Sequence, residues 1–72
     1  MKEKLPRITA NKLISILEKK GFALVRQSGS HKIYRNADHV RVTIPYHSGG
    51  ILHPKILKQI IIDADLTLDD LK

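Results

Sequence analysis

Four histidines are the residues of this chain best suited to exchange protons near neutral pH. They are His31, His39, His47 and His53, and the chain has no cysteine that could serve as a nucleophile instead. Successive histidines are eight, eight and six residues apart, so no two of them form a helical ligand pair of the H-E-x-x-H type. The spacing favours acid–base chemistry over metal binding, and we expect neither a metal nor another cofactor.

His31 has the most informative surroundings of the four. It follows Gly29-Ser30, where glycine permits a tight turn and the serine hydroxyl can form a local hydrogen bond. Arg26 lies on the strand predicted before this turn, and Lys32 and Arg35 follow His31 on the next strand. A phosphodiester held by these cations would therefore have an imidazole within reach.

RNA cleavage requires little more than such a set of side chains. An imidazole can take the proton of a ribose 2′-hydroxyl while arginine and lysine stabilise the charge that grows on phosphorus, with no metal. Spacing alone, however, more often marks a histidine that only hydrogen-bonds its turn. At this point the role of His31 stays open between these two interpretations.

The other three histidines have weaker signals. His47 follows the third predicted strand and precedes Ser48-Gly49-Gly50, a small loop that can approach a ligand, although an exposed loop residue is the simpler interpretation. His39 lies at a predicted hairpin turn, and His53 lies directly before Pro54 at a predicted helix start. We assign no function to His39 or His53.

The periodicity of apolar residues predicts the elements that position these side chains. A first amphipathic helix is expected from Thr9 to Lys20, closed by a left-handed Gly21. The remaining predictions are strands at Phe22 to Gln27, His31 to Arg35 and His39 to Pro45, tight turns at Ser28-Gly29 and Asn36 to Asp38, a helix from Pro54 to about Asp63, and a final helical turn capped by Thr67.

This order predicts an α+β fold of helix, three-stranded antiparallel sheet and helix, with both helices on one face of the sheet. In the third strand Val42 and Ile44 alternate with Arg41 and Thr43, so the exposed face is basic. Four residues of the second helix are expected to face the core: Ile56, Leu57, Ile60 and Ile61. Function then belongs on the open face of the sheet.

Length and charge indicate which kinds of molecule this chain binds. The 72 residues suffice for one domain, residues 1–72, and the formal net charge is +6. Ten of the 13 lysine and arginine residues lie within the first 41 positions. Such an excess favours a polyanion, with nucleic acid first and an acidic protein second. The charged start and the lack of an apolar run of ~20 residues predict a cytoplasmic protein without a membrane segment.

Several motifs occur together between about Ile8 and Leu68. The run R-Q-x-G-S-H, which ends at His31, is the most specific of them. The others are Leu13 to Glu18, Lys20 to Phe22, Val42 to Pro45 with His47, Leu57 to Ile61, and Ala64 to Leu66. In this combination the chain resembles the HicA family of toxins, also called YcfA-like proteins. It differs where many members have Gly-Thr, at Lys55-Ile56, and where many have glycine, at Asp65.

The resemblance implies a fold like that of double-stranded-RNA-binding domains, metal-independent cleavage of messenger RNA, and a HicB antitoxin as partner. His31 matches the catalytic histidine of the family, and the antitoxin would cover His31 and the basic face. The candidate RNA contacts are Arg26, Ser30, Lys32, Arg35, Arg41 and His47. Two alternatives stay open: an RNA-binding module without catalysis, and a subunit that meets only an acidic protein.

Overall fold

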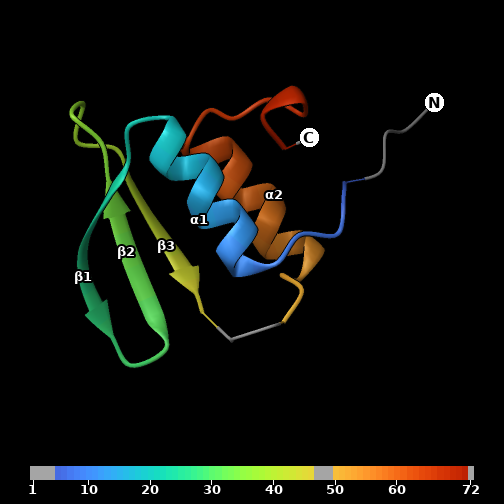
Figure 1. Ribbon diagram of the computed structural model, residues 1–72, viewed down its shortest axis with the longest axis horizontal. Coiled ribbons are helices and arrows are strands. Elements are labelled where there is room, and N and C mark those ends of the chain that lie inside the picture. The colour runs from blue at the N-terminus through green and yellow to red at the C-terminus, as the bar shows by residue number, and fades with distance from the viewer. Residues whose placement is uncertain (1–4, 47–49, 72) are drawn as a thin grey trace.

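The computed structural model describes residues 5–46 and 50–71. Helix α1 (Ala10–Lys19) precedes a sheet of β1 (Ala23–Ser28), β2 (His31–Arg35) and β3 (Arg41–Pro45), and helix α2 (Pro54–Asp63) and the 3₁₀ helix η1 (Asp69–Leu71) follow. Both α-helices lie on the same side of the sheet (Figure 1). The predicted α+β order of helix, three antiparallel strands and helix is confirmed. No helix in the described ranges is long and apolar enough to cross a membrane.

The sheet is antiparallel, with β2 between β1 and β3. Along β3 the buried side chains of Val42 and Ile44 alternate with exposed ones, as the sequence predicts. Strand β1 differs, because every one of its residues is exposed. It lies beyond the helical layer (Figure 1), and its pairing with β2 is irregular between Leu24 and Arg26. The sheet is therefore covered over β2 and β3 and uncovered at β1.

The ends of α1 follow from local hydrogen bonds. The Thr9 hydroxyl accepts the Lys12 N–H at 3.2 Å and caps the start. At the other end Gly21 has φ 95°, and the N–H of Phe22 reaches the carbonyl of Leu17. This is a Schellman closure, in which a left-handed residue lets the chain turn back over the last turn of the helix. Phe22 consequently belongs to the closure, and β1 begins one residue later than predicted.

Helix α2 ends in the same way but with a different residue. The N–H of Leu66 reaches the carbonyl of Ile61, and Asp65 occupies the left-handed position with φ 56°. Its start is capped by His53, whose Nδ1 accepts the Lys55 N–H at 3.1 Å. The sequence analysis assigned His53 no function, and the structure gives it this capping contact.

The turns around β2 and β3 differ from the predictions by one or two residues. The first hairpin turns at Gly29-Ser30, not at Ser28-Gly29, because Ser28 still pairs with His31. Strand β3 begins at Arg41 instead of His39. The cause is the Asn36 side chain, which accepts the Val40 N–H at 2.9 Å, while His39 adopts φ 65°. These bonds keep the chain in a turn until Val40.

The core lies between the helices and the covered face of the sheet. Its most deeply buried side chains are Leu13, Leu17, Val42, Ile44 and Leu57. The prediction for Ile56 was wrong, because this side chain is 37% exposed. The buried line of α2 runs through Leu57, Ile60 and Ala64, which places Ile56 at its border.

The C-terminal turn is fastened to α1. Thr67 and Asp70 form a reciprocal cap, in which each backbone N–H donates to the side chain of the other residue. The Asp70 carboxylate also lies 3.5 Å from the Lys20 ammonium. Leu71 is buried in the core. The predicted cap at Thr67 is thus confirmed, and η1 closes one end of the helical layer.

Replacing Asp65 by glycine should stabilise the protein. A left-handed conformation costs most L-residues roughly 1–2 kcal/mol and costs glycine almost nothing. We expect Asp65→Gly to raise the free energy of unfolding by up to about 1 kcal/mol, measured by urea denaturation. Asp65→Ala serves as the control and should lower it. A Gly variant no more stable than the Ala variant would contradict this account of the closure.

Acid should weaken the cap of η1. The Thr67 backbone N–H, and to a smaller extent Lys20, hold the pKa of Asp70 below its ordinary value of 3.8. A lowered pKa in the folded state means that ionised Asp70 stabilises the fold above that ordinary value, and that this contribution disappears as pH falls through the lowered value. Asp70→Ala should therefore destabilise the protein near neutral pH, and this loss should become smaller as the pH falls below the ordinary value of 3.8. Urea midpoints measured from neutral pH downward test this, and a loss that stays constant as the pH falls would contradict it.

Candidate active site

His31 is the first residue of β2 and comes directly after a two-residue loop. Gly29 has φ 58°, a conformation suited to glycine at the first position of such a hairpin loop. The Gln27 side chain donates to the Gly29 carbonyl at 3.1 Å and braces the loop. The pairing of Ser28 with His31 closes the hairpin. The imidazole is exposed, so a ligand can reach it.

The alternation of β2 decides which neighbours share a face with His31. Tyr34 is buried against the helices, so His31, Ile33 and Arg35 lie on the opposite, open face. Burial raises the pKa of the Tyr34 hydroxyl, and Glu18 acts in the same direction. Tyr34 therefore stays protonated and does not compete with His31 for proton transfer.

Two further arginines lie on the open face. Arg41 of β3 pairs with Arg35 of β2, and Arg26 of β1 pairs with Ile33. No carboxylate of a described residue forms an ion pair with any of these three arginines. Like charges directly across a sheet destabilise it, so the pair of Arg35 and Arg41 costs stability that an anionic ligand would recover.

Lys32 lies on the other side of the sheet from His31. It pairs with Ile44, which is fully buried on the helix side. Its ammonium is 3.9 Å from the centre of the Tyr46 ring, a cation–π contact. The sequence placed Lys32 beside His31 because the two are adjacent in the chain, whereas adjacent residues of a strand point to opposite faces.

The structure places one of the two remaining candidate contacts. Ser30 is exposed in the hairpin loop, and its carbonyl accepts the Tyr46 N–H. It therefore lies beside His31 at the same end of the sheet. His47 lies outside the described residues. Of the candidate contacts, Arg26, Ser30, Arg35 and Arg41 are brought to the open face or its rim.

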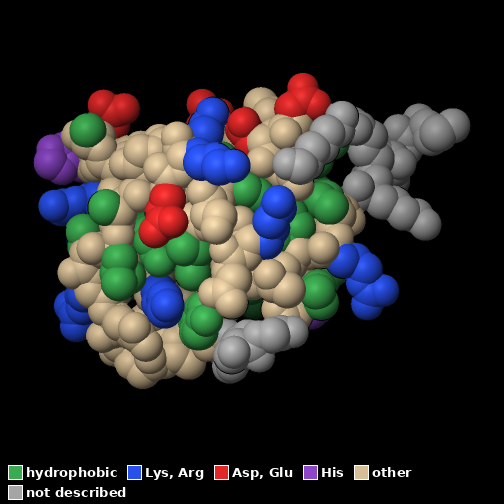
Figure 2. All heavy atoms as spheres, in the orientation of Figure 1, with side chains coloured by type: hydrophobic (Ala, Val, Ile, Leu, Met, Phe, Trp, Pro, Cys, Tyr) green, Lys and Arg blue, Asp and Glu red, His purple; other side chains and the backbone are tan. Residues whose placement is uncertain are grey.

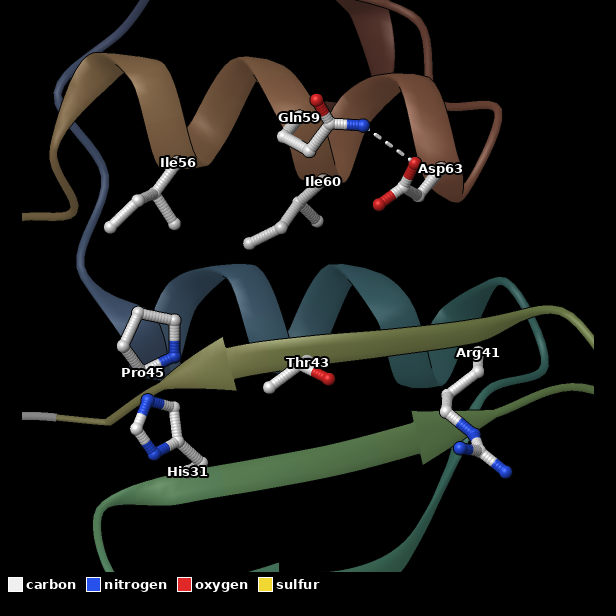
Figure 3. Close-up of a pocket in the computed structure, with 8 residues that line it drawn as sticks. All are labelled: His31, Arg41, Thr43, Pro45, Ile56, Gln59, Ile60 and Asp63. Carbon is white, nitrogen blue, oxygen red and sulfur yellow. Dashed lines mark hydrogen bonds between the residues drawn. The ribbon is translucent and has the colours of Figure 1, made fainter.

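A groove of about 410 Å³ runs along the free edge of β3, between the sheet and α2. From the sheet it is lined by His31, Arg41, Thr43 and Pro45. From α2 it is lined by Ile56, Gln59, Ile60 and Asp63. Figure 3 shows His31 and Pro45 together at one end and the Gln59–Asp63 pair at the other. The candidate catalytic histidine thus borders a cavity.

The sequence analysis missed the α2 side of this groove. A signal was available, because Ile56, Gln59, Ile60 and Asp63 are spaced as i, i+3, i+4 and i+7 and so share one helical face. Their aliphatic character instead led to the prediction that Ile56 and Ile60 both lie in the core. Within this set only Ile60 is buried, and the other three are exposed.

The charges of the molecule are distributed unevenly. In the view of Figure 2, most acidic side chains lie along the upper rim, and basic side chains are spread over the rest of this face. Among the described residues no group of three His, Cys, Asp or Glu side chains could hold a metal ion. The open face therefore offers an imidazole and arginines to a ligand.

Comparison with known proteins supplies the family. The sequence model described as HicA toxin of bacterial toxin–antitoxin systems matches residues 10–66. The chain belongs to the HicA toxin family. The matched residues of this HicA chain include the whole sheet, both α-helices and the closure of α2 at Asp65. No curated protein shows significant similarity to the chain.

Family membership confirms the resemblance noted in the sequence. A HicA protein is the toxin of a toxin–antitoxin system, so this chain has a toxin role and an antitoxin as its partner. The match includes the R-Q-x-G-S-H run that ends at His31.

Removing one of the paired arginines should raise the stability of the fold and weaken its binding to a polyanion. Arg41→Gln removes the like-charge pair with Arg35 and should raise the free energy of unfolding by roughly 0.2–1 kcal/mol. It should also reduce the slope of log affinity for single-stranded RNA against log salt by about 1. Filter binding at several salt concentrations and urea denaturation measure the two effects.

Lys58→Gln is the matched control for this prediction. Lys58 is exposed on α2 and does not line the groove, so the same loss of charge there should change the salt slope less. Equal salt slopes for the two variants would contradict a specific role of the open face.

Proposed function

We propose that this HicA-family toxin is a metal-independent endoribonuclease of the cytoplasm that cleaves messenger RNA, with His31 as general acid–base. One observation carries the proposal. The alternation of β2 and β3 sets His31, Arg35 and Arg41 on one uncovered face, and no carboxylate of a described residue forms an ion pair with Arg35 or Arg41. This face combines a proton acceptor with cations that bind phosphate.

The reaction is an internal transesterification. The His31 imidazole takes the proton of a ribose 2′-hydroxyl, and the 2′ oxygen forms a bond to phosphorus. The bond between phosphorus and the 5′ oxygen breaks, and that oxygen takes up a proton from water or from a lysine. The products are a 2′,3′-cyclic phosphate end and a 5′-hydroxyl end. The reaction needs the 2′-hydroxyl, so it selects RNA over DNA.

The position of each arginine in the sheet determines which phosphate of the RNA it can contact. Arg26 pairs with Ile33 and is therefore a diagonal neighbour of His31, about 7–8 Å away. Arg35 lies four residues further along β2, about 13 Å from His31. Arg26 is thus the cation nearest to the reacting phosphate. Arg35 and Arg41 hold phosphates farther along the same RNA chain.

The other predicted contacts would bind RNA without taking part in the reaction. Ser30 lies in the loop beside His31, and His47 comes two residues after the end of β3 in the sequence. Both stay candidate RNA contacts. Lys32 acts from the opposite face, as part of the long-range attraction for RNA. A HicB-like antitoxin inhibits the toxin by covering the open face and His31.

Replacement of His31 tests the proposal. His31→Ala should abolish growth arrest when expressed from a tightly repressed promoter. The purified variant should cleave RNA at least about a hundredfold more slowly than wild type, the usual contribution of a general base. Wild-type cleavage should persist in a chelator and stop when the cleaved nucleotide lacks its 2′-hydroxyl.

His53→Ala is the control for this experiment. It also removes an exposed histidine, but one that caps α2, and it should keep its cleavage activity. Equal growth arrest by wild type and His31→Ala would refute the catalytic role. If wild type and His31→Ala both bind RNA in a salt-dependent way and leave it intact, the protein is an RNA-binding module without catalysis. If neither binds RNA at moderate salt, the partner of the basic face is an acidic protein.

A further inference from the structure

The groove along β3 has the size of a binding site for one small group. Its volume of about 410 Å³ falls within the range of roughly 300–1,000 Å³ that ligand pockets occupy. His31 forms part of its wall at one end. A substrate whose phosphodiester lies at His31 would therefore place its neighbouring nucleoside in or beside the groove.

One wall of the groove is apolar and accessible. The side chains of Ile56 and Ile60 point from α2 toward β3, and Pro45 lies opposite them (Figure 3). Ile56 is 37% exposed although it is a large aliphatic residue. Enzymes that hold single nucleobases place their planar faces against apolar or aromatic side chains. Ile60 is only 3% exposed, so in this chain with few aromatic residues the exposed Ile56 and the half-buried Pro45 form the apolar surface available for a base.

The other end of the groove offers hydrogen-bond acceptors. The Gln59 Nε2 group donates to Asp63 Oδ1 at 2.8 Å. This bond fixes the orientation of the Gln59 amide, so Gln59 Oε1 and Asp63 Oδ2 remain available as acceptors. A carboxylate at this position repels phosphate and attracts N–H groups. The pair therefore suits the donor edge of a nucleobase, while Arg41, which lines the groove from β3 near Asp63 (Figure 3), is the group there that suits a phosphate.

The free edge of β3 is a poor site for an added protein strand. Tyr46 donates its N–H to the carbonyl of Ser30 in the loop before β2, so alternation turns the backbone of Pro45 toward the free edge. Proline has no N–H to offer there, which interrupts a new ladder at the end of the groove next to His31. The chemistry of this edge favours a nucleotide over a partner strand.

We infer that the groove between β3 and α2 binds one unpaired RNA base adjacent to the scissile phosphodiester, and that Gln59 and Asp63 select a base with amino donors. Guanine suits the acceptors best, because its N1–H and amino group lie side by side. Uracil suits them least, because its single N–H lies between two carbonyl oxygens. The inference rests on the proposed ribonuclease activity and specifies which RNA that activity accepts.

The test compares base preference in wild type and Asp63→Asn. Four oligonucleotides that differ only at the position next to the cleaved bond are cleaved under identical conditions, once with the variable base on the 5′ side and once on the 3′ side. Wild type should cleave the guanine substrate at least about tenfold faster than the uracil substrate on one side, since two hydrogen bonds to one base edge discriminate against the wrong base by about this factor or more. Asp63→Asn should reduce this ratio to below about threefold.

Asp38→Asn is the matched control. It makes the same change in charge in the exposed turn before β3, away from the groove, and should keep the wild-type base preference. A wild type without base preference, or the same preference in wild type and Asp63→Asn, would overturn the inference. If wild type cleaves none of the oligonucleotides, the ribonuclease proposal fails, whereas equal cleavage of all four overturns only the inference about the groove.

A second pair of variants tests the apolar wall. Ile56→Glu places a second carboxylate in the groove and should reduce cleavage of every substrate at least about tenfold. Ile62→Glu makes the same change at a side chain that is 62% exposed and does not line the groove, and should leave cleavage unchanged. Circular dichroism establishes that both variants fold. Equal cleavage by the two folded variants would overturn the inference, as would loss of antitoxin binding without loss of cleavage in Ile56→Glu.

Discussion

The packing of the helices on two strands is the constraint on which the candidate site depends. Burial of Tyr34, Val42 and Ile44 on the helix side forces the residues between them to the other side, because side chains alternate along a strand. His31 and Arg41 are exposed for this reason, and alternation along the strands alone accounts for their exposure. A shift of one residue in the pairing of β2 and β3 would bury the arginines and expose the core.

The fold could be predicted well because its local signals agree with one another. Thr9 and Gly21 mark the ends of the first helix, and the structure uses both residues as the sequence suggests. The errors at strand ends are caused by local hydrogen bonds. The amide of Asn36 extends the second turn, and the Schellman bond of Phe22 delays β1. Such bonds depend on geometry that periodicity does not contain.

The candidate site could be predicted only in part. The R-Q-x-G-S-H run drew attention to His31, and the alternation of the third strand gave the basic face. Lys32 was placed wrongly relative to His31, because proximity along the chain does not imply a shared face. Ile56 was assigned to the core, because a helix of mostly aliphatic residues has no clear boundary between its buried and exposed faces. The groove emerges only when α2 and β3 are placed side by side.

Strand β1 has a consequence for the behaviour of the protein when it is alone. Its outer edge is unpaired in the sheet, and Leu24 and Val25 are about half exposed, a combination that invites edge-to-edge aggregation. The irregularity near Val25 disrupts a regular edge, and the positive charge of Arg26 makes the approach of a second copy unfavourable. The same basic character that suits the open face to RNA thus helps to keep an unpartnered toxin dispersed.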